Sequence, residues 1–374
     1  MMQYRFDKIA FNSTAKKKPT EEDKERYIGL EHLDSDCLSV TRWGSDVAPT
    51  GEKLLMKKGD VLFGKRRAYQ RKVGIAPFDG IFSAHGMVLR PNEEVIDKDF
   101  FPFFISSDQF MERAVRISVG GLSPTINWKD LREQEFEIPS LSEQKKLSAQ
   151  LWASYRLKES YKKLLAATDE MVKSQFIEMF GEYQYKEKLS SLCETFIDGD
   201  WIESKDQSEE GIRLVQTGNI GYGYFKDKEN KSRYISEDTF NRLHCTEIFA
   251  GDILVSRLPD PIGRACIVPK GIDRMITAVD CSIIRLKDVI LPEYFISYTM
   301  TSTYSAQINE VTTGTTRRRV SRANLGNVLV PCPSIEAQRQ FVAIFQQADK
   351  SKFELRKSIE AIDKVIKSLV NVNL

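Results

Sequence analysis

The 374-residue sequence predicts an α+β chain: two similar, strand-rich α/β domains in tandem, separated by two long antiparallel coiled-coil helices with pseudo-two-fold symmetry. Three observations predict this fold. One half of the chain repeats the other, each half begins with short apolar runs, and each half ends in a long helical pattern. We expect the first domain at 1–139, its helix at 140–182, the second domain at 183–333 and its helix at 334–374.

The repeat extends across most of both halves. The stretches 120–147 and 314–341 align without a gap, with Gly120 on Gly314. Upstream, the string GDVL at 59–62 aligns with GDIL at 251–254. Chance similarity of apolar strands would explain single matches, but an ordered series indicates duplication of one folding unit.

The first part of each half is predicted to be a mixed, strand-rich globular domain. Short apolar runs, such as Asp60–Phe63, Met87–Leu89 and Ile253–Val255, are separated by Gly, Pro and Asp residues. This spacing is typical of strands joined by turns.

A long helix is predicted after Ser140 and after Ser334. Ser140 is followed three residues later by Glu143, which completes a capping box, whereas Ser334 has Ala337 there and keeps only the cap. Neither following run contains Gly or Pro, and the apolar residues recur with the 3.5-residue period of a coiled coil. The residues predicted to pair the helices are Leu147, Leu151, Tyr161, Leu165, Val172, Phe341, Phe345, Leu355, Ile359, Ile362, Ile366 and Leu369.

Two packing arrangements of these helices are open. Each helix would be about 57 Å long at 1.5 Å per residue, whereas a domain of this size has a radius of about 15 Å. Pairing of the helices with each other is therefore favoured over packing of each helix on its own domain. Polar residues at Ser154, Lys158, Thr168 and Gln175 dilute the first stripe.

Basic residues cluster locally although the net charge is only +2. Between Lys53 and Lys72, eight basic residues accompany a single acid, Asp60. Basic loops suit phosphate contacts, and arginine can also read guanine in the major groove, so we interpret these clusters as DNA contacts rather than as a solvated basic face. The predicted DNA-binding residues are Lys57, Lys58, Lys65, Arg66, Arg67, Tyr69, Arg71, Lys72, Arg257, Arg264, Arg274, Arg317, Arg318, Arg319 and Arg322.

The sequence offers no recognisable catalytic motif. The stretch Gly59–Lys65 fits a phosphate-binding GxxxxGK loop, but Arg66 follows where that loop needs Ser or Thr, and the middle of the stretch looks like a buried strand. The six cysteines and three histidines are scattered without metal-ligand spacing. We therefore expect a chain without catalytic residues, metal or cofactor of its own.

No apolar run approaches the roughly 18 residues that span a membrane. The first ten residues also lack the apolar stretch of a signal peptide. The sequence thus predicts a cytoplasmic protein with no membrane partner.

Several strings carry a family resemblance. Three strings resemble segments of the specificity subunits of type I restriction-modification systems. They are GDVLFGKRRAYQRKVGIAP at 59–77, FSAHGMVLRP at 82–91 and GGLSPTINWKDLREQEFEIPSLSEQ at 120–144. YIGLEHL at 27–33 and DGDWIES at 198–204 are also similar to segments of that family.

The resemblance implies a non-catalytic subunit with two target-recognition domains, each reading one half of a bipartite site in double-stranded DNA. The paired helices would set the spacer and dock two adenine-N6 methyltransferase subunits, and two endonuclease/translocase subunits would complete the assembly. S-adenosylmethionine, ATP and magnesium would then bind the partner subunits. Recognition domains of this family differ widely, so no base-contacting residue is carried over.

Two alternative functions remain open at this point. The chain could serve a type II system with a fused methyltransferase–nuclease, or it could be a coiled-coil scaffold whose globular ends bind proteins. DNA binding that weakens as salt rises would separate the DNA-reading alternatives from the scaffold.

Overall fold

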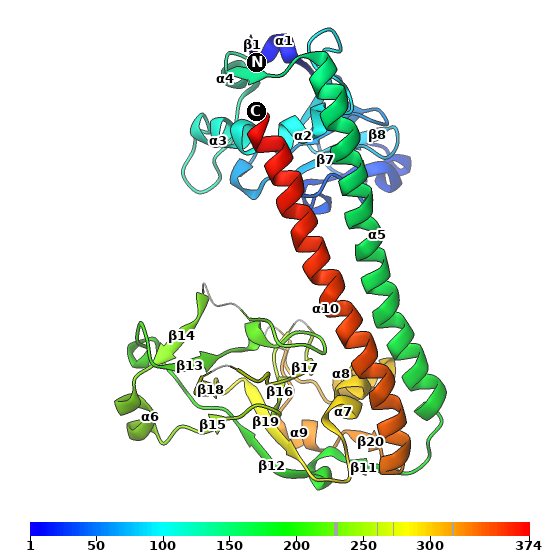
Figure 1. Ribbon diagram of the computed structural model, residues 1–374, viewed down its shortest axis with the longest axis vertical. Coiled ribbons are helices and arrows are strands. Elements are labelled where there is room, and N and C mark those ends of the chain that lie inside the picture. The colour runs from blue at the N-terminus through cyan, green and yellow to red at the C-terminus, as the bar shows by residue number, and fades with distance from the viewer. Residues whose placement is uncertain (228–230, 260, 272, 316–317) are drawn as a thin grey trace. The chain divides into compact units, whose positions relative to one another are not determined.

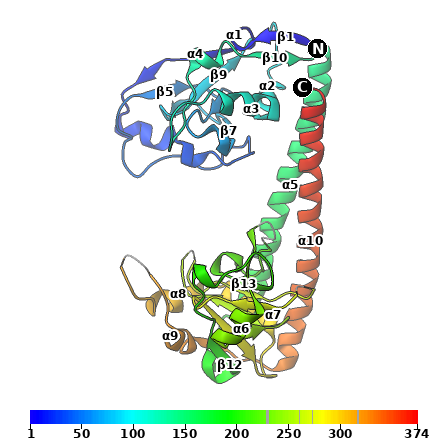
Figure 2. The same ribbon diagram turned by 90° about the vertical axis from the view of Figure 1, so that its left-hand side faces the viewer.

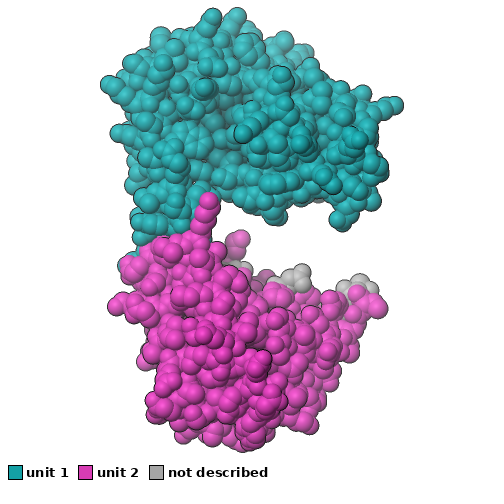
Figure 3. Space-filling view, turned by 90° about the vertical axis from the view of Figure 1, so that its right-hand side faces the viewer, with its two compact units in different colours: residues 1–162, 356–374 teal, residues 163–355 magenta. Residues whose placement is uncertain are grey.

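The structure is a computed structural model that describes residues 1–374 apart from 228–230, 260, 272 and 316–317. It contains two compact units, one made of Met1–Lys162 with Arg356–Leu374 and the other of Lys163–Leu355 (Figure 3). Each unit combines one globular domain with parts of both long helices. The division of the chain into four consecutive segments stays a prediction.

Two four-stranded sheets form the globular part of the first unit. The antiparallel sheet has the spatial order β2 (Ala10–Ser13), β9 (Met87–Pro91), β6 (Val61–Phe63) and β7 (Val73–Ile75). The mixed sheet has the order β3 (Lys16–Lys17), β5 (Lys53–Met56), β8 (Gly80–Phe82) and β4 (Tyr27–Ile28), with β4 parallel to β8.

The second unit repeats this arrangement. Its antiparallel sheet has the order β12 (Cys193–Asp198), β19 (Cys281–Leu286), β16 (Ile253–Ser256) and β17 (Ala265–Ile267). Its mixed sheet has the order β14 (Arg233–Ile235), β13 (Ile212–Val215), β18 (Met275–Thr277) and β15 (Glu247–Ile248), with β13 parallel to β18. The mixed sheets share three strands and differ in the fourth, because β3 extends one edge in the first unit and β14 the opposite edge in the second.

Apolar runs without alternation occur where a strand is buried on both faces. Successive side chains of a strand point to opposite faces. In β6, Val61 and Phe63 join the phenylalanine-rich core of the first unit, whereas Leu62 joins a second cluster with residues of β5, β8 and β9. The side chains of β16 are distributed in the same way: Ile253 and Val255 join the main core of the second unit, whereas Leu254 joins a separate cluster. This double burial accounts for the GDVL and GDIL strings.

The Gly-Asp pair in each string forms a turn and a buried ion pair. Gly59 and Gly251 both have positive φ, which glycine adopts without strain. Asp60 accepts hydrogen bonds from the backbone N–H of Lys57 and from Arg90, at 2.8 and 2.7 Å. Asp252 and Arg285 form the same pair at 2.9 Å in the second unit, so the single acid in the basic stretch has a structural role.

Shorter elements complete both units. Two-stranded antiparallel sheets join β1 (Met2–Arg5) to β10 (Glu135–Ile138) and β11 (Lys186–Lys188) to β20 (Leu329–Pro331). The short α-helices are α1 (Phe6–Ile9), α2 (Phe101–Ser106), α3 (Asp108–Arg116), α4 (Trp128–Leu131), α6 (Glu237–Leu243), α7 (Pro292–Thr299), α8 (Ser302–Glu310) and α9 (Arg322–Gly326). The 3-10 turns are η1 (Glu21–Arg26), η2 (Leu30–His32), η3 (Ala68–Gln70), η4 (Leu189–Leu192), η5 (Ser204–Asp206) and η6 (Thr217–Asn219).

The two long helices are α5 (Leu141–Phe180) and α10 (Ile335–Val372). The predicted capping box is confirmed at α5, where the Ser140 N–H and hydroxyl donate to Glu143 at 2.9 and 2.7 Å and the Glu143 N–H donates back at 3.4 Å. α10 keeps only the cap, since the Ala337 N–H donates to Ser334 at 3.3 Å.

α5 and α10 run side by side in opposite directions, as predicted (Figures 1 and 2). In the first unit the Lys158 ammonium of α5 binds Asp363 of α10, and in the second unit Lys352 of α10 binds Asp169 of α5 at 3.0 Å. Both lysine side chains are only 9% exposed. The predicted α+β fold with paired helices is therefore confirmed, and the polar residue that dilutes the first stripe at Lys158 is an interhelical ion-pair partner.

The predicted helix-pairing residues divide into two groups. Toward the ends of the helices they enter the domain cores: Leu147 and Leu151 join the first core, with Ile366 and Leu369 packed against it, and Val172, Phe341 and Phe345 join the second. Tyr161, Leu165, Leu355, Ile359 and Ile362 are half-buried. The expectation that helix-to-helix pairing would prevail over packing on a domain is thus too simple, because each helix does both.

Candidate nucleic-acid interface

The basic segment Lys65–Arg67 meets the segment Ser123–Ile126 at one edge of the first unit, where β6 and β8 end. The Ile126 N–H donates to the carbonyl of Lys65 at 3.0 Å, and the Arg67 N–H donates to the carbonyl of Pro124 at 2.7 Å. The Arg66 N–H donates to the carbonyl of His85, just beyond β8, at 3.3 Å. We call Lys65, Arg66, Arg67, His85 and Ser123 the first strand-end surface.

The arginines of this surface are held in defined positions. Arg67 has φ of +56°, which is uncommon for a residue with a side chain, and its guanidinium donates to the Ser123 hydroxyl at 3.1 and 3.2 Å. Arg66 and Arg67 are exposed, as is Tyr69 in the following turn. Burial and the nearby Lys16 lower the pKa of Lys65 below its usual value.

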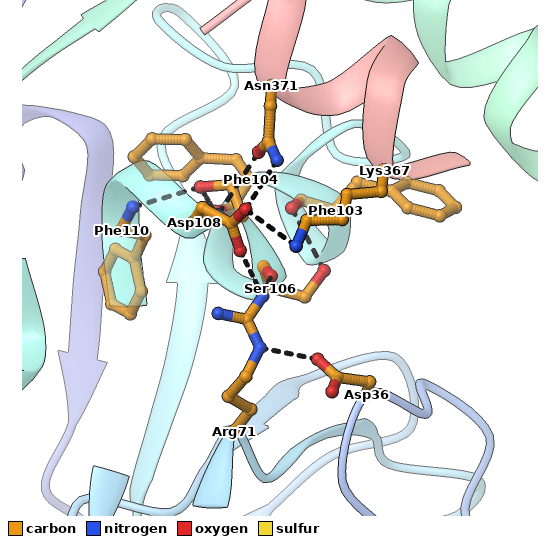
Figure 4. Close-up of polar contacts among 10 residues, drawn as sticks. Asp36, Arg71, Phe103, Phe104, Ser106, Asp108, Phe110, Lys367 and Asn371 are labelled. Atoms are coloured by element: carbon orange, nitrogen blue, oxygen red, sulfur yellow. Dashed lines mark hydrogen bonds and ion pairs between the residues drawn. The ribbon is translucent and has the colours of Figure 1, made fainter. Parts of the chain in front are cut away.

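Arg71 and Lys72 serve the fold instead of the exposed surface. Figure 4 shows Arg71 between Asp36 and Asp108, at 2.6 and 3.0 Å, with a further bond to the carbonyl of Ser106. The Lys72 ammonium donates to the carbonyl of Leu30 at 2.6 Å. Because Arg71 and Lys72 already bind these groups, neither side chain is placed to bind a DNA phosphate.

Asp108 also ties the end of α10 to the first domain (Figure 4). Its carboxylate accepts a hydrogen bond from the Asn371 amide at 2.7 Å and lies 3.3 Å from the Lys367 ammonium. Burial raises the pKa of Asp108, but the bond to Lys367, the positive charges of Arg71 and Lys367, and the Asn371 bond outweigh it, so the pKa lies below its usual value.

The matching edge of the second unit has the same construction with different side chains. The Arg257 N–H donates to the carbonyl of Asp280, just beyond β18, at 2.9 Å, and the Val320 N–H donates to the carbonyl of Arg257 at 3.2 Å. Thr313 and Arg319 exchange backbone hydrogen bonds at 2.9 Å, and the Arg319 guanidinium lies 3.5 Å from Asp280. We call Arg257, Asp280, Arg318 and Arg319 the second strand-end surface, in which Arg318 and Arg319 are exposed.

Two predicted DNA contacts in the second unit are buried structural residues. Arg264 is 7% exposed and donates to the carbonyls of four residues, Thr217, Ile220, Leu258 and Pro261. Arg257 is 4% exposed and donates to the carbonyl of Val279. Burial lowers the pKa of Arg257, and Asp198 opposes that shift. Because these guanidiniums are enclosed by protein, the structure argues against a direct DNA contact for both.

Other predicted residues lie away from the strand ends. Lys57 and Lys58 precede β6 and are exposed at its opposite end. Arg274 precedes β18 and is bound by Glu237 and Glu247 at 2.7 and 3.1 Å. Arg322 is exposed at the start of α9, and Arg317 lies outside the described residues.

Sequence reasoning missed a cleft in the second unit, beside the end of β13. Trp201, Gln207, Gln216 and Arg233 line it with neighbouring residues of the loop after β12. None of these residues belongs to a basic cluster, so charge could not indicate them. The signal that could have found them is an exposed tryptophan in the Gly-Asp-rich loop after β12.

The described residues give no support to the other site types considered. Val61–Phe63 is a central strand, not a phosphate-binding loop. Within the described part of the chain, no three His, Cys, Asp or Glu side chains are grouped as metal ligands would be. The six cysteines are unpaired, and burial raises the pKa of Cys266 to about 12.

The two halves of the chain both match one family model, described as the type I restriction modification DNA specificity domain. The matches cover residues 8–166 and 182–363. The chain belongs to this family. Two specificity subunits of type I systems are similar to this chain, one over part of its length and the other over most of it.

The EcoDI specificity subunit of Escherichia coli is 28% identical over 142 residues, which cover 37% of this chain and 31% of that subunit. The MjaVIII specificity subunit of Methanocaldococcus jannaschii is 22% identical over 371 residues, covering 93% of this chain and 84% of that one.

Solved structures share the fold. The S subunit of a type I system from M. genitalium has a TM-score of 0.52 at 14% identity, covering 98% of this chain and 95% of that chain. A chain from a study of complex assembly and conformational transition in a type I system has a TM-score of 0.55 at 17% identity, covering 99% and 96%. Among the described residues of this specificity subunit, no helix has the length and apolar character to cross a membrane.

Proposed function

We propose that this specificity subunit reads a bipartite site in double-stranded DNA, with one half-site for each unit. The observation that carries the proposal is the repeated strand-end surface. The backbone contact between Ile126 and Lys65 recurs between Val320 and Arg257, at the same edge of both units. The exposed arginines at this edge differ in position, because Arg66 and Arg67 follow β6 whereas Arg318 and Arg319 lie in the segment before α9. A repeated frame with unlike side chains suits two half-sites of unlike sequence.

The exposed arginines fit phosphate or guanine contacts, since both need a guanidinium that reaches beyond the protein surface. Arg66, Arg67, Arg318 and Arg319 meet this condition. Lys57, Lys58 and Arg322 are exposed elsewhere and would add to the general attraction for DNA. Arg257 and Arg264 would instead shape the loops that carry the contacts.

The partners follow from the same proposal. The paired helices α5 and α10 would set the spacer between the half-sites and dock two adenine-N6 methyltransferase subunits, joined by two endonuclease/translocase subunits. S-adenosylmethionine would bind the methyltransferases, and ATP with magnesium the translocases. This chain would contribute recognition, with the chemistry on its partners.

Binding to duplex DNA at increasing salt tests the proposal. Between 50 and 200 mM salt we expect affinity to fall by at least about tenfold, because phosphate contacts release counterions. Arg66→Ala and Arg318→Ala should each weaken binding and reduce the salt slope by about one. Arg274→Ala, whose guanidinium is already bound by two glutamates, is the matched control and should change little.

Two outcomes would contradict the proposal. A chain that retains no duplex at low salt would not be a DNA reader. If the affinity for duplex DNA changes neither with salt nor with the Arg66 and Arg318 substitutions, the result would favour a protein-binding scaffold.

A further inference from the structure

The cleft beside β13 brings together side chains suited to base edges. It has a volume of about 530 Å³, and Trp201, Gln207, Gln216 and Arg233 line it with residues of the Ile202–Lys205 segment. Glutamine can pair bidentately with adenine and arginine with guanine, so this set differs in kind from a purely basic phosphate surface.

The strand register places Gln216 and Arg233 on one face of the sheet. β14 pairs antiparallel with β13, and Arg233 lies directly opposite Leu214. Gln216 keeps the extended conformation, with φ of −121° and ψ of 170°. Because side chains alternate along a strand, Gln216 points to the same face as Leu214 and is therefore a diagonal neighbour of Arg233.

Trp201 forms an exposed apolar wall of the cleft. The preceding Asp200 is anchored to the end of β18, where its N–H donates to the carbonyl of Thr277 at 2.8 Å and its carbonyl accepts from the Val279 N–H at 2.9 Å. The tryptophan side chain beyond this anchor is 71% exposed. A large exposed ring on a fixed backbone offers a surface for a thymine methyl group or a sugar.

The first unit has the same backbone at this place without these side chains. The Gln216 N–H donates to Asn219 Oδ1 at 3.0 Å, and the Gly29 N–H donates to His32 Nδ1 at 2.9 Å, each just after the strand that is parallel to β18 or β8. Gln216 therefore corresponds to Gly29, which has no side chain to read a base. β14, which carries Arg233, extends the mixed sheet of the second unit only.

We propose that Gln216 and Arg233 determine sequence specificity in the second unit, Gln216 by contact with adenine and Arg233 by contact with guanine in the major groove. This inference rests on the proposed DNA-reading function. It goes beyond it by locating base recognition in a cleft, with the exposed arginines of the second strand-end surface left to hold the backbone. Loss of either contact should reduce discrimination at one base pair by about ten- to a hundredfold.

The test uses the full chain with its methyltransferase subunit and a duplex library with randomised positions. Gln216→Ala should relax an A·T pair and Arg233→Ala a G·C pair, both within the same half of the selected motif, with the other half unchanged. Gln216→Glu supplies acceptors only and should shift the preference at that pair toward cytosine. Gln184→Ala, an exposed glutamine beyond α5, and Arg274→Ala are matched controls and should keep the wild-type motif.

The outcomes separate this inference from the proposed function. A wild-type complex that selects no motif would refute DNA reading itself. A wild-type motif that Gln216→Ala, Gln216→Glu and Arg233→Ala all preserve at every position would overturn the cleft while leaving DNA reading intact. Relaxation of both halves together would also overturn it, because a cleft in one unit reads one half-site.

Discussion

At the scale of single residues, two buried glutamines connect the long helices to their domains in the same way. Gln144 accepts a hydrogen bond from the Asp97 N–H at 2.7 Å and donates to the carbonyls of Val95 and Pro139. Gln338, at the equivalent position, makes the corresponding three bonds in the second unit. Both side chains are fully buried, so each amide satisfies three backbone groups that water cannot reach.

Replacing these glutamines should destabilise one unit each. Gln144→Ala leaves buried backbone groups without partners, and we expect a loss of about 2–3 kcal/mol in the free energy of unfolding of the first unit. Gln338→Ala should affect the second unit similarly. Urea unfolding measures both, with the exposed Gln150→Ala and Gln340→Ala as controls that should stay within about 0.5 kcal/mol of the wild type. Equal effects of buried and exposed substitutions would contradict this role.

The carboxylate of Asp108 should make the stability of the first unit depend on pH. Its pKa in the folded chain lies below the usual value of an aspartate side chain. A lowered folded-state pKa contributes stability that is complete above the unfolded value and is lost as pH falls through the folded value. Asp108→Asn should therefore reduce the unfolding free energy by on the order of 1 kcal/mol at pH 7, and the difference should vanish on acidification below the lowered pKa.

Thermal unfolding of wild type and Asp108→Asn, from pH 7 down to below the lowered pKa of Asp108, measures how the stability difference changes with pH. Asp46→Asn, in an exposed loop of the same unit, should match the wild type throughout. A difference between wild type and Asp108→Asn that grows on acidification would have the wrong sign.

The residue scale also shows what charge in a sequence can and cannot predict. The stretch around Arg66 and Arg67 was correctly placed in a loop, and the structure leaves both exposed. Arg264 has the same residue type in a similar loop, yet its guanidinium binds four backbone carbonyls. Sequence alone cannot separate an arginine that faces solvent from one that satisfies turns, because two of the four carbonyls, those of Thr217 and Ile220, come from a distant segment.

At the scale of elements, the buried Lys–Asp pairs define how α5 and α10 pass each other. Lys158 and Lys352 are equivalent positions of the repeat, and each binds an aspartate of the other helix. An apolar stripe with a 3.5-residue period predicted that the helices pair. The aspartates lay outside that stripe, so the pairing partners of the two lysines were not predictable from periodicity.

The two members of the first pair should contribute unequally. Asp363→Ala leaves the buried Lys158 ammonium unpaired and should lower the unfolding free energy of the first unit by about 2–3 kcal/mol. Lys158→Met should cost less than about 1 kcal/mol, because Asp363 is 48% exposed and remains hydrated. In the second unit Asp169→Ala should cost less than Asp363→Ala, since Lys352 also has Asp349 at 3.8 Å. Chemical unfolding of the three variants checks this order, and a larger effect of Lys158→Met than of Asp363→Ala would contradict it.

At the scale of the whole molecule, duplication is the property that the sequence predicted most fully. Matching strings at 59–62 and 251–254, and at 120–147 and 314–341, located the same strand, turn and helix entry in both units. The differences between the units were less accessible. β3 and β14 extend opposite edges of otherwise similar sheets. The cleft lined by Gln216 depends on β14, and no sequence motif indicates this extra strand.

The central claim is that each unit reads its own half of one DNA site. Its most direct test is to replace residues 183–333 with the corresponding segment of a relative that has a different motif, and to map N6-methyladenine across a genome in cells that also express the methyltransferase. The account predicts that one half of the methylated motif changes to that of the relative, while the other half and the spacer stay as they were. A change in both halves, or an unchanged motif in a methylating complex, would contradict it.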